Sequence, residues 1–349
     1  MRRLPIYFLI DVSESMVGEP IEQVHEGIGT IIRDLRTDPY ALETVYVSII
    51  AFAGKAQRIT PLIELYNFYP PKLPIGGGTS LGNAFKFLIG ELDSSIQKTT
   101  LDQKGDWKPI IFLFTDGTPT DKYEPAFDKW NKEYRSKTNL VVVSIGDNID
   151  ASIFSKITEN VLLLKKTDSE SFKSFFKWVT ASIKTSSISI SDSKDDGLHL
   201  APITNGYLSK IDLEKSAIHT IDENFAVILA KCQKTKRLYL IKYQKRISSS
   251  GIKELELNTL DYKLVGAFPV ENSYYDLSEG DASKTTINSS DLIGFPTCPH
   301  CGNKFGFSHC GCGNIMCTGD EEISHCPWCG IDASFGFSEG GLNINRTRG

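Results

Sequence analysis

The chain lacks any apolar run close to the roughly 20 residues that a membrane-spanning helix needs. It also lacks a strong charge of either sign: a formal net charge of −5 over 349 residues argues against a general binder of nucleic acid or acidic membranes. Catalytic patterns are missing too, since there is no Ser-His-Asp set, paired-carboxylate hydrolase signature or kinase loop. We therefore expect no enzyme, no nucleic-acid partner and no membrane partner.

Before residue 298 the chain has a single cysteine, Cys232, whereas seven cysteines fall between 298 and 329. The opening residues, two arginines and then the apolar run 4–10, are too short for a signal peptide and offer no small-residue cleavage site. We interpret that run as the first strand. In a chain without a signal, clustered C-x-x-C pairs indicate metal rather than disulfides, so we expect a reducing, cytoplasmic location.

Strands and helices alternate through the first half of the chain. Apolar runs predict strands over 6–10, 44–52, 110–114, 140–145 and 161–164, and an antiparallel edge strand over 57–65. Helical spacing of apolar residues predicts helices over 21–35, 81–92, 125–134, 152–157 and 169–183. Such alternation predicts an α/β fold with a doubly wound, mostly parallel sheet.

The composition changes after this half. We expect a first domain over 1–187, a Ser-, Lys- and Asp-rich linker over 188–210, and a β-rich part over 211–295 that contains a hairpin and a polar loop at 279–290. A zinc-ribbon-like module over 296–335 and a flexible tail over 336–349 complete the expected small β-rich zinc-binding domain.

Three separated pieces of the first half offer oxygen ligands. A D-x-S-x-S string supplies Asp11, Ser13 and Ser15, a glycine run is followed by Thr79, and a T-D-G turn supplies Asp116. Asp11 and Asp116 each follow a predicted strand, and ligands of open parallel sheets bind beyond the carboxyl ends of strands. Two carboxylates and three hydroxyls suit Mg2+ or Mn2+. Taken alone, the first string could equally be a strand end before a helix cap. We expect Glu14, inside the string, to face solvent.

These five residues resemble the metal-ion-dependent adhesion site of von Willebrand factor A domains. The resemblance implies that Asp11 balances the charge of the ion, that the three hydroxyls coordinate it, and that Asp116 binds directly or through one water. It also implies that an Asp or Glu of a protein partner completes the coordination shell.

The cysteines form two near-identical C-P-x-C-G turns, Cys298/Cys301 and Cys326/Cys329, which we expect to hold one structural Zn2+ with four thiolates. Cys310, Cys312 and Cys317 suggest a second zinc, completed by His309, His325 or Cys232. The alternative is a cross-braced arrangement in which Cys310 and Cys312 share a metal with Cys326 and Cys329. Cys232 itself is expected to be a small buried hydrophobe.

Residues from about 212 to 335 are similar to the C-terminal metal-binding domain of TerY-type tellurite-resistance proteins. The resemblance implies an adaptor in a bacterial stress or defence system, linked to a protein kinase and a phosphatase. Two alternatives are a zinc module with ubiquitin-ligase-like activity and nucleic-acid binding through the ribbon. The second is disfavoured because residues 296–349 carry more acidic than basic side chains.

Overall fold

A computed structural model describes residues 2–102, 104–145, 152–164, 169–192, 201, 208–210, 224–249, 258–278, 285–318, 323–334 and 341–347. These residues divide into two compact units, which are described separately. The first comprises Met1–Val12, Gly18–Pro74 and Thr79–Ile218, and the second comprises Ser13–Val17, Ile75–Gly78 and His219–Gly349.

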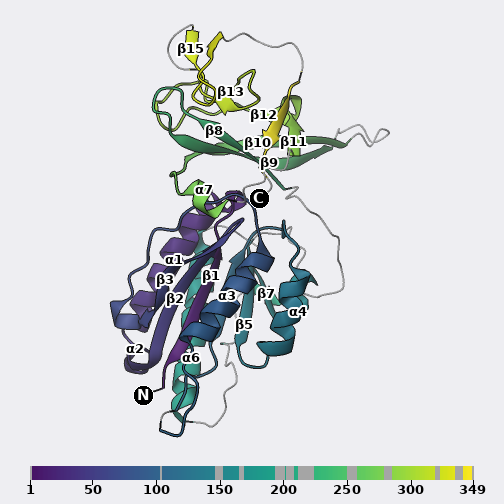
Figure 1. Cartoon of the computed structure of the whole chain (residues 1–349). Coiled ribbons are helices and arrows are strands. Elements are labelled where there is room, and N and C mark those ends of the chain that lie inside the picture. The colour runs from purple at the N-terminus through teal and green to yellow at the C-terminus, as the bar shows by residue number, and fades with distance from the viewer. Residues whose placement is uncertain are drawn as a thin grey trace. The chain divides into compact units, whose positions relative to one another are not determined.

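The first unit is built on a seven-stranded sheet in the order β3-β2-β1-β4-β5-β6-β7 (Figure 1). Its strands are β1 (Leu4–Asp11), β2 (Val45–Phe52), β3 (Ala56–Glu64), β4 (Ile110–Thr115), β5 (Asn139–Ile145), β6 (Asn160–Leu164) and β7 (Leu208–Lys210). The five central strands are parallel, and β3 and β7 run antiparallel at the edges. The order confirms the predicted doubly wound, mostly parallel sheet.

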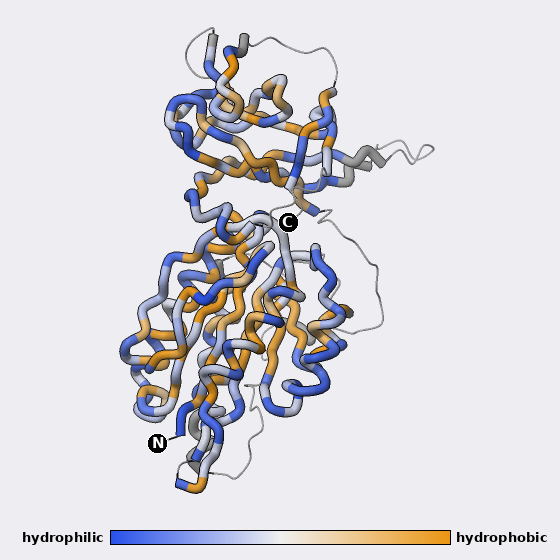
Figure 2. The backbone as a smooth tube through the Cα atoms, in the orientation of Figure 1, coloured by the Kyte–Doolittle hydropathy of each residue, from blue (hydrophilic) through white to orange (hydrophobic). Residues whose placement is uncertain are grey.

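Helices cover both faces of this sheet because its central strands are apolar on both sides. The helices are α1 (Glu19–Leu35), α2 (Pro39–Thr44), α3 (Leu81–Ser95), α4 (Glu124–Glu133), α5 (Ser152–Ser155) and α6 (Ser169–Asp192). Helices α1 and α6 pack together, with Phe176 of α6 against Gly27 and Phe114. On the other face α3 and α4 meet through Phe85 and Trp130, whose rings lie edge to face. The hydrophobic tracts of this unit follow the sheet strands (Figure 2).

Two features of this unit differ from the prediction. Helix α6 continues to Asp192, into the segment expected as a linker, and β7 at 208–210 pairs with β6. Within α6 the hydroxyls of Thr180, Ser182 and Thr185 donate to carbonyls four residues earlier, so a Ser/Thr-rich sequence remains compatible with a helix. The remaining linker residues lie largely outside the described part of the chain.

The second unit contains a six-stranded sheet in the order β12-β10-β9-β8-β14-β13 and two small two-stranded sheets. Its elements are β8 (Phe225–Lys231), β9 (Leu238–Ser249), β10 (Asn258–Pro269), α7 (Tyr274–Leu277), β11 (Thr285–Asn288), β12 (Leu292–Ile293), β13 (Ser308–His309), β14 (Ile315–Met316), β15 (Ile323–His325), β16 (Asp332–Ser334) and β17 (Asn343–Arg346). The predicted hairpin is β8 and β9, which pair antiparallel.

Alternate side chains of β8 and β9 enter two different cores. Ile228, Tyr239 and Ile241 pack on the face that carries four of the cysteines, while Val227 and Leu240 pack on the other face. Both faces are buried, which explains why these strands read as nearly continuous apolar runs.

The predictions of a flexible tail and of a polar loop are wrong in part. Residues 343–346 form β17, which pairs antiparallel with β11 at 285–288, inside the segment expected as a loop. Ile344 of this ribbon is buried, and the Arg346 guanidinium donates to the carbonyl of Phe225 at 2.7 Å. A four-residue strand with one apolar side chain gives too weak a period to be found in the sequence.

Candidate functional site: two metal centres

Two of the predicted oxygen ligands follow adjacent strands of the first sheet. Asp11 is the last residue of β1, Asp116 directly follows β4, and β1 and β4 are parallel neighbours. The chain moves from β1 to β2 on one side and from β4 to β5 on the other, so the topological switch point lies between these strands. Thr115 donates its hydroxyl to Asp11 Oδ2 at 2.6 Å and fixes that carboxylate.

The loop that carries Thr79 is fixed by the loop that follows β4. Thr79 N donates to Thr120 Oγ1 at 3.0 Å, and Thr120 N donates to the Thr79 carbonyl at 2.8 Å. Asp121 accepts from the first backbone N–H groups of α3, at Gly82 and Asn83. Thr115, Thr120 and Asp121 were missed from the sequence. Thr115 belongs to the T-D-G turn but was given no role there, and nothing in that pattern extends to Thr120 and Asp121.

Thr79 Oγ1 provides a test of whether a cation fits. This oxygen is completely buried and has no hydrogen-bond partner among the described residues. A buried hydroxyl oxygen without a partner is costly unless something else satisfies it. A hard cation would do so, and Thr79 is one of the five predicted ligands.

The predicted ligands Ser13 and Ser15 lie in the second unit, where their hydroxyl oxygens are 3.0 Å apart. Both side chains are buried. All five predicted oxygen ligands are thus buried, although the coordination set as a whole stays a prediction.

Glu14 was expected to face solvent, but only 1% of its surface is exposed. Within the second unit its carboxylate accepts from the Gly78 backbone N–H at 3.0 Å and from the hydroxyl of Tyr274. Burial, and then the Glu14 charge, raise the pKa of Tyr274 well above its usual value, so Tyr274 remains a donor. Nothing in the sequence indicated this burial, because a charged residue between two ligand positions is normally expected to face solvent.

A buried lysine also contacts this segment of the second unit. Lys242, on β9, donates its ammonium group to the carbonyls of Ser15 and Val17 and lies 4.4 Å from the centre of the Phe225 ring. Carbonyls and an aromatic face compensate part of the cost of burying this charge.

The cysteines form two groups of four, each with all sulfurs within 4.8 Å of one another. The first cysteine group is Cys232, Cys298, Cys301 and Cys317, and the second cysteine group is Cys310, Cys312, Cys326 and Cys329. The expected sharing of one zinc by the two C-P-x-C-G turns is therefore wrong, and the second group consists of the four cysteines that the cross-braced alternative names. His309 and His325 belong to neither group.

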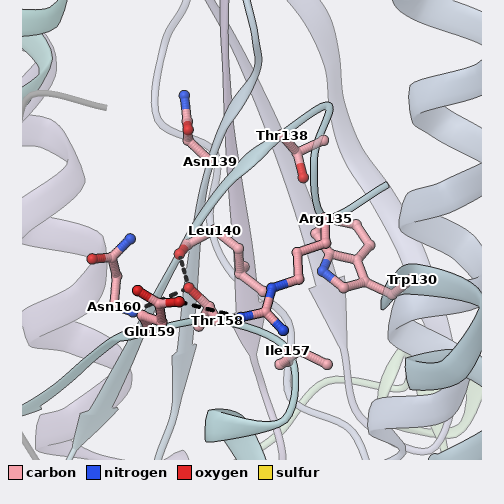
Figure 3. A pocket seen from close by; sticks show the side chains of 9 residues that line it. All are labelled: Trp130, Arg135, Thr138, Asn139, Leu140, Ile157, Thr158, Glu159 and Asn160. Carbon is pink, nitrogen blue, oxygen red and sulfur yellow. Dashed lines mark hydrogen bonds and ion pairs between the residues drawn. The ribbon is translucent and has the colours of Figure 1, made fainter. Parts of the chain in front are cut away.

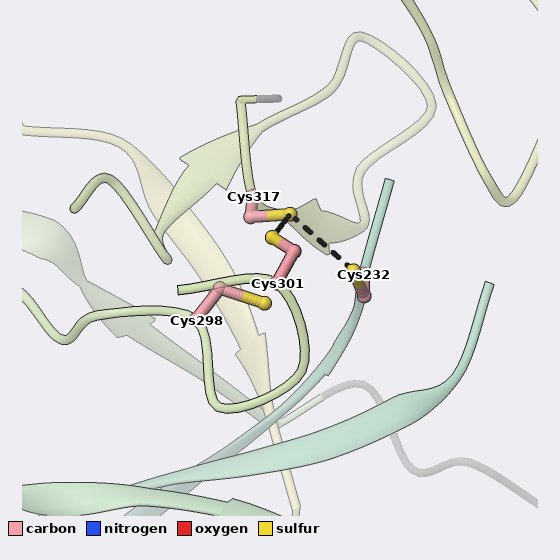
Figure 4. Close-up of side chains that lie close together, drawn as sticks. All are labelled: Cys232, Cys298, Cys301 and Cys317. Carbon is pink, nitrogen blue, oxygen red and sulfur yellow. Dashed lines mark hydrogen bonds between the residues drawn. The ribbon is translucent and has the colours of Figure 1, made fainter. Parts of the chain in front are cut away.

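Cys232 is buried, as expected, but its sulfur also lies with the first cysteine group, which makes it one of the candidate ligands considered for zinc (Figure 4). The reason is strand pairing: β14 runs parallel to β8 and places Met316 beside Lys231, so the next residues, Cys317 and Cys232, meet. Their sulfurs are 3.9 Å apart. A contact made across 85 positions cannot be read from local spacing.

The turns that present the cysteines share one hydrogen-bond pattern. Cys298 N donates to the Asn303 carbonyl, and Gly302 N donates to the Cys298 carbonyl. The Cys326 turn repeats this pattern with Gly330. Gly302 and Gly330 both have positive φ, near 75°, which glycine adopts without steric cost. The final glycine of each C-P-x-C-G turn is thus explained by its backbone.

The geometry of both groups fits zinc. Tetrahedral Zn2+ with Zn–S bonds of about 2.3 Å requires sulfurs about 3.8 Å apart. Cys301 and Cys317 are 3.7 Å apart, and the pairs Cys310/Cys329 and Cys312/Cys326 are each 3.9 Å apart. Four thiolates leave no open position, so zinc here would contribute folding energy rather than catalysis.

The first cysteine group has its own polar surroundings. Burial alone would raise the pKa of Cys232, but hydrogen bonds from Thr235 and its neighbours lower the pKa to about 7. Burial and the nearby thiolates raise the pKa of Tyr239, whose hydroxyl therefore stays protonated and donates to the Gly306 carbonyl at 2.6 Å. That bond ties the loop that follows the Cys298 turn to β9.

A small polar pocket of about 190 Å³ lies elsewhere in the first unit, at the amino ends of β5 and β6 (Figure 3). Arg135 and Glu159 form an ion pair of 3.6 Å beside it. It contains none of the predicted metal ligands, and Asp11 and Asp116 lie at the opposite, carboxyl ends of their strands.

Family models match both halves of the chain. The von Willebrand factor type A domain matches residues 6–178, and the TerY-C metal binding domain matches residues 222–349. The chain has the TerY-type architecture. The four-cysteine groups of the second unit belong to its metal-binding domain, and the α/β sheet of the first unit belongs to its von Willebrand factor A domain.

Among curated proteins, mouse inter alpha-trypsin inhibitor heavy chain 4 is 31% identical over 123 residues, which cover 33% of this chain and 12% of that protein. Bovine inter-alpha-trypsin inhibitor heavy chain H1 is 25% identical over 118 residues, or 33% and 13% of the two chains. This chain therefore matches only about an eighth of the length of these relatives.

Solved structures are similar at lower identity. The pilus adhesin SpaC from Lactobacillus rhamnosus GG is 12% identical over 53% of this chain and 31% of its own, with a TM-score of 0.43. Proximal thread matrix protein 1 of the mussel byssus, solved with a zinc-occupied adhesion motif, is 15% identical over 53% of this chain and 46% of its own, with a TM-score of 0.39.

Among the described residues, no helix is long and apolar enough to cross a membrane.

Proposed function

We propose that this TerY-type protein is a non-enzymatic, cytoplasmic adaptor that binds a protein partner through Mg2+ or Mn2+. Asp11, Ser13, Ser15, Thr79 and Asp116 would hold the ion, and an Asp or Glu of the partner would complete its coordination. The buried hydroxyl of Thr79, which has no hydrogen-bond partner in the described part of the chain, is the observation that carries this proposal. Domains of the von Willebrand factor A type are protein-interaction modules, which is consistent with it.

Neighbouring residues of this chain would hold the proposed ligands in position without a bound ion. Thr115 orients Asp11, and Thr120 and Asp121 hold the Thr79 loop, so few side chains need to be reordered on binding. Five protein oxygens would leave one position of an octahedral shell open for an acidic ligand. The bound ion would supply the attraction for that ligand.

Divalent-ion binding tests the ligand set. Asp11→Ala should abolish Mn2+ binding measured by calorimetry while the first unit stays folded, because Asp11 lies at the end of its strand. Asp128→Ala removes an exposed carboxylate of the same unit and should leave binding unchanged. Undiminished Mn2+ binding by Asp11→Ala would refute the assignment.

A pull-down from native lysate tests the adaptor role. Thr79→Val keeps the side-chain shape and removes the coordinating oxygen. It should weaken capture of the partner about tenfold, which corresponds to about 1.4 kcal/mol. Thr30→Val is the matched control, because that hydroxyl donates to the Glu26 carbonyl one helix turn earlier. Equal recovery with wild type, Thr79→Val and EDTA-treated protein would contradict metal-mediated binding.

The finer proposal is that the partner is a protein kinase or phosphatase in a tellurite-type stress or defence system. It rests on the TerY-type architecture. Mass spectrometry of the metal-dependent fraction of the pull-down tests it, since a kinase or phosphatase should be enriched there and lost with EDTA.

A further inference from the structure

The two cysteine groups differ in their access to solvent. In the first cysteine group Cys232, Cys298 and Cys317 are each at most 1% exposed, and they pack in the same core as Tyr239 and Ile228. In the second cysteine group Cys312 and Cys329 are exposed and only Cys310 and Cys326 are buried. A soluble oxidant can therefore approach the second group more readily than the first.

The packing around the second group is also much thinner. Its buried members, Cys310 and Cys326, pack with Met316 and with the partly buried ring of Trp328. The Cys326 turn directly follows β15 of a two-stranded sheet, and Trp328 within the turn donates its Nε1–H to the Ile315 carbonyl of β14 at 2.8 Å. Regions with few buried apolar contacts open at low free-energy cost.

Within the second group, each exposed sulfur has a buried one beside it. Cys312 Sγ lies 3.9 Å from Cys326 Sγ, and Cys329 Sγ lies 3.9 Å from Cys310 Sγ. A disulfide requires the sulfurs to approach to about 2.05 Å, which is a movement of about 2 Å. Two attacking thiolates and two resolving thiolates are thus already paired in space.

We propose that the second cysteine group is a reaction site for hydroperoxides, at which oxidation forms a disulfide and releases zinc while the first group keeps its ion. This inference concerns the second unit alone and is independent of the adaptor function. The first group would preserve the six-stranded sheet during the reaction, because its cysteines lie in the core of that sheet.

The chemistry balances with the hydroperoxide as the only oxidant. The Cys329 or Cys312 thiolate attacks the terminal peroxide oxygen, the S–O bond forms and the O–O bond breaks, and the alkoxide leaving group takes a proton from water. The neighbouring buried thiolate then attacks the sulfenic sulfur, the S–S bond forms, and hydroxide leaves. Two thiolates, one hydroperoxide and one water become one disulfide, one alcohol and two hydroxide ions. Loss of two of its four ligands frees the zinc.

The test uses the full-length, zinc-loaded chain treated with hydrogen peroxide at a small molar excess. A chromophoric chelator reports zinc release, and mass spectrometry after differential alkylation locates the oxidised cysteines. One zinc per chain should leave at least tenfold faster than the other, with the early disulfides confined to Cys310, Cys312, Cys326 and Cys329. The first group in the same molecule is the control.

A second measurement does not depend on disulfide formation. A brief pulse of a maleimide reagent on the zinc-loaded chain, followed by denaturation and a second label, should mark Cys312 or Cys329 before any member of the first group. Equal rates of loss for both zinc ions, or first labelling at Cys298 or Cys301, would overturn the proposal.

Discussion

At the scale of single residues, Lys236 is the only described non-glycine residue with positive φ, at 58°. It occupies the turn after Cys232, where Lys236 N donates to the Cys232 carbonyl and Cys232 N donates to the Arg237 carbonyl. This is the hydrogen-bond pattern of the turns at Cys298 and Cys326, where a glycine holds the corresponding position. Thr235 stands where those turns have their second cysteine, so Cys232 contributes one thiolate instead of two.

We expect Lys236→Gly to stabilise the second unit by up to about 1 kcal/mol, because a left-handed conformation costs a non-glycine residue about 1–2 kcal/mol and part of this is offset by the greater freedom of unfolded glycine. Lys234→Gly, in the same turn but without positive φ, should instead destabilise the unit. The midpoint of denaturant-induced zinc release from the loaded protein measures both. A fall of equal size in the two variants would contradict the strain at Lys236.

At the scale of secondary-structure elements, the contact between α1 and α6 depends on one glycine. A Cβ placed on Gly27 would lie 1.8 Å from Phe176, whereas a Cβ on Gly29, two residues further along α1, would meet nothing within 4 Å. The absent side chain at Gly27 lets the ring of Phe176 stack near Phe114 of the central strand β4. Sequence periodicity predicts α1 itself, but it does not distinguish the roles of the two glycines.

Gly27→Ala should therefore destabilise the first unit by about 1–3 kcal/mol through overpacking. Gly29→Ala is the matched control and should stabilise the same helix by about 0.5–1 kcal/mol, because alanine is the better helix former. Denaturant unfolding followed by the fluorescence of the buried Trp130 measures the difference. If both substitutions stabilise the unit, the close packing of α1 on α6 is not as described.

At the scale of the whole molecule, the two cysteine groups predict two zinc ions per chain. Cys232→Ala should reduce the zinc content to one and loosen the six-stranded sheet, since metal binding and folding are coupled. Thr235→Ala, in the same turn but without a thiolate, should keep both ions. Metal analysis of the purified variants decides, and two zinc ions in Cys232→Ala would exclude Cys232 as a ligand.

Two features of the structure follow from the sequence, the buried strands of the first unit and the metal-binding turns of the second. The apolar runs before Asp11 and Asp116 predict buried strands of a parallel sheet, because strands buried on both faces need continuous apolar side chains. The C-P-x-C-G turns predict zinc for a local reason as well, since the glycine with positive φ is needed within the turn itself.

Only the tertiary structure decided how the cysteines are shared. Pairing of β14 with β8 brings Cys317 to Cys232 and leaves Cys326 and Cys329 for the second group. The same holds for the burial of Glu14 and for the strand at 343–346. Local spacing sets which residues can form a turn or a strand, whereas the partner of each turn or strand depends on contacts between residues far apart in the chain, which leave no periodic trace in the sequence.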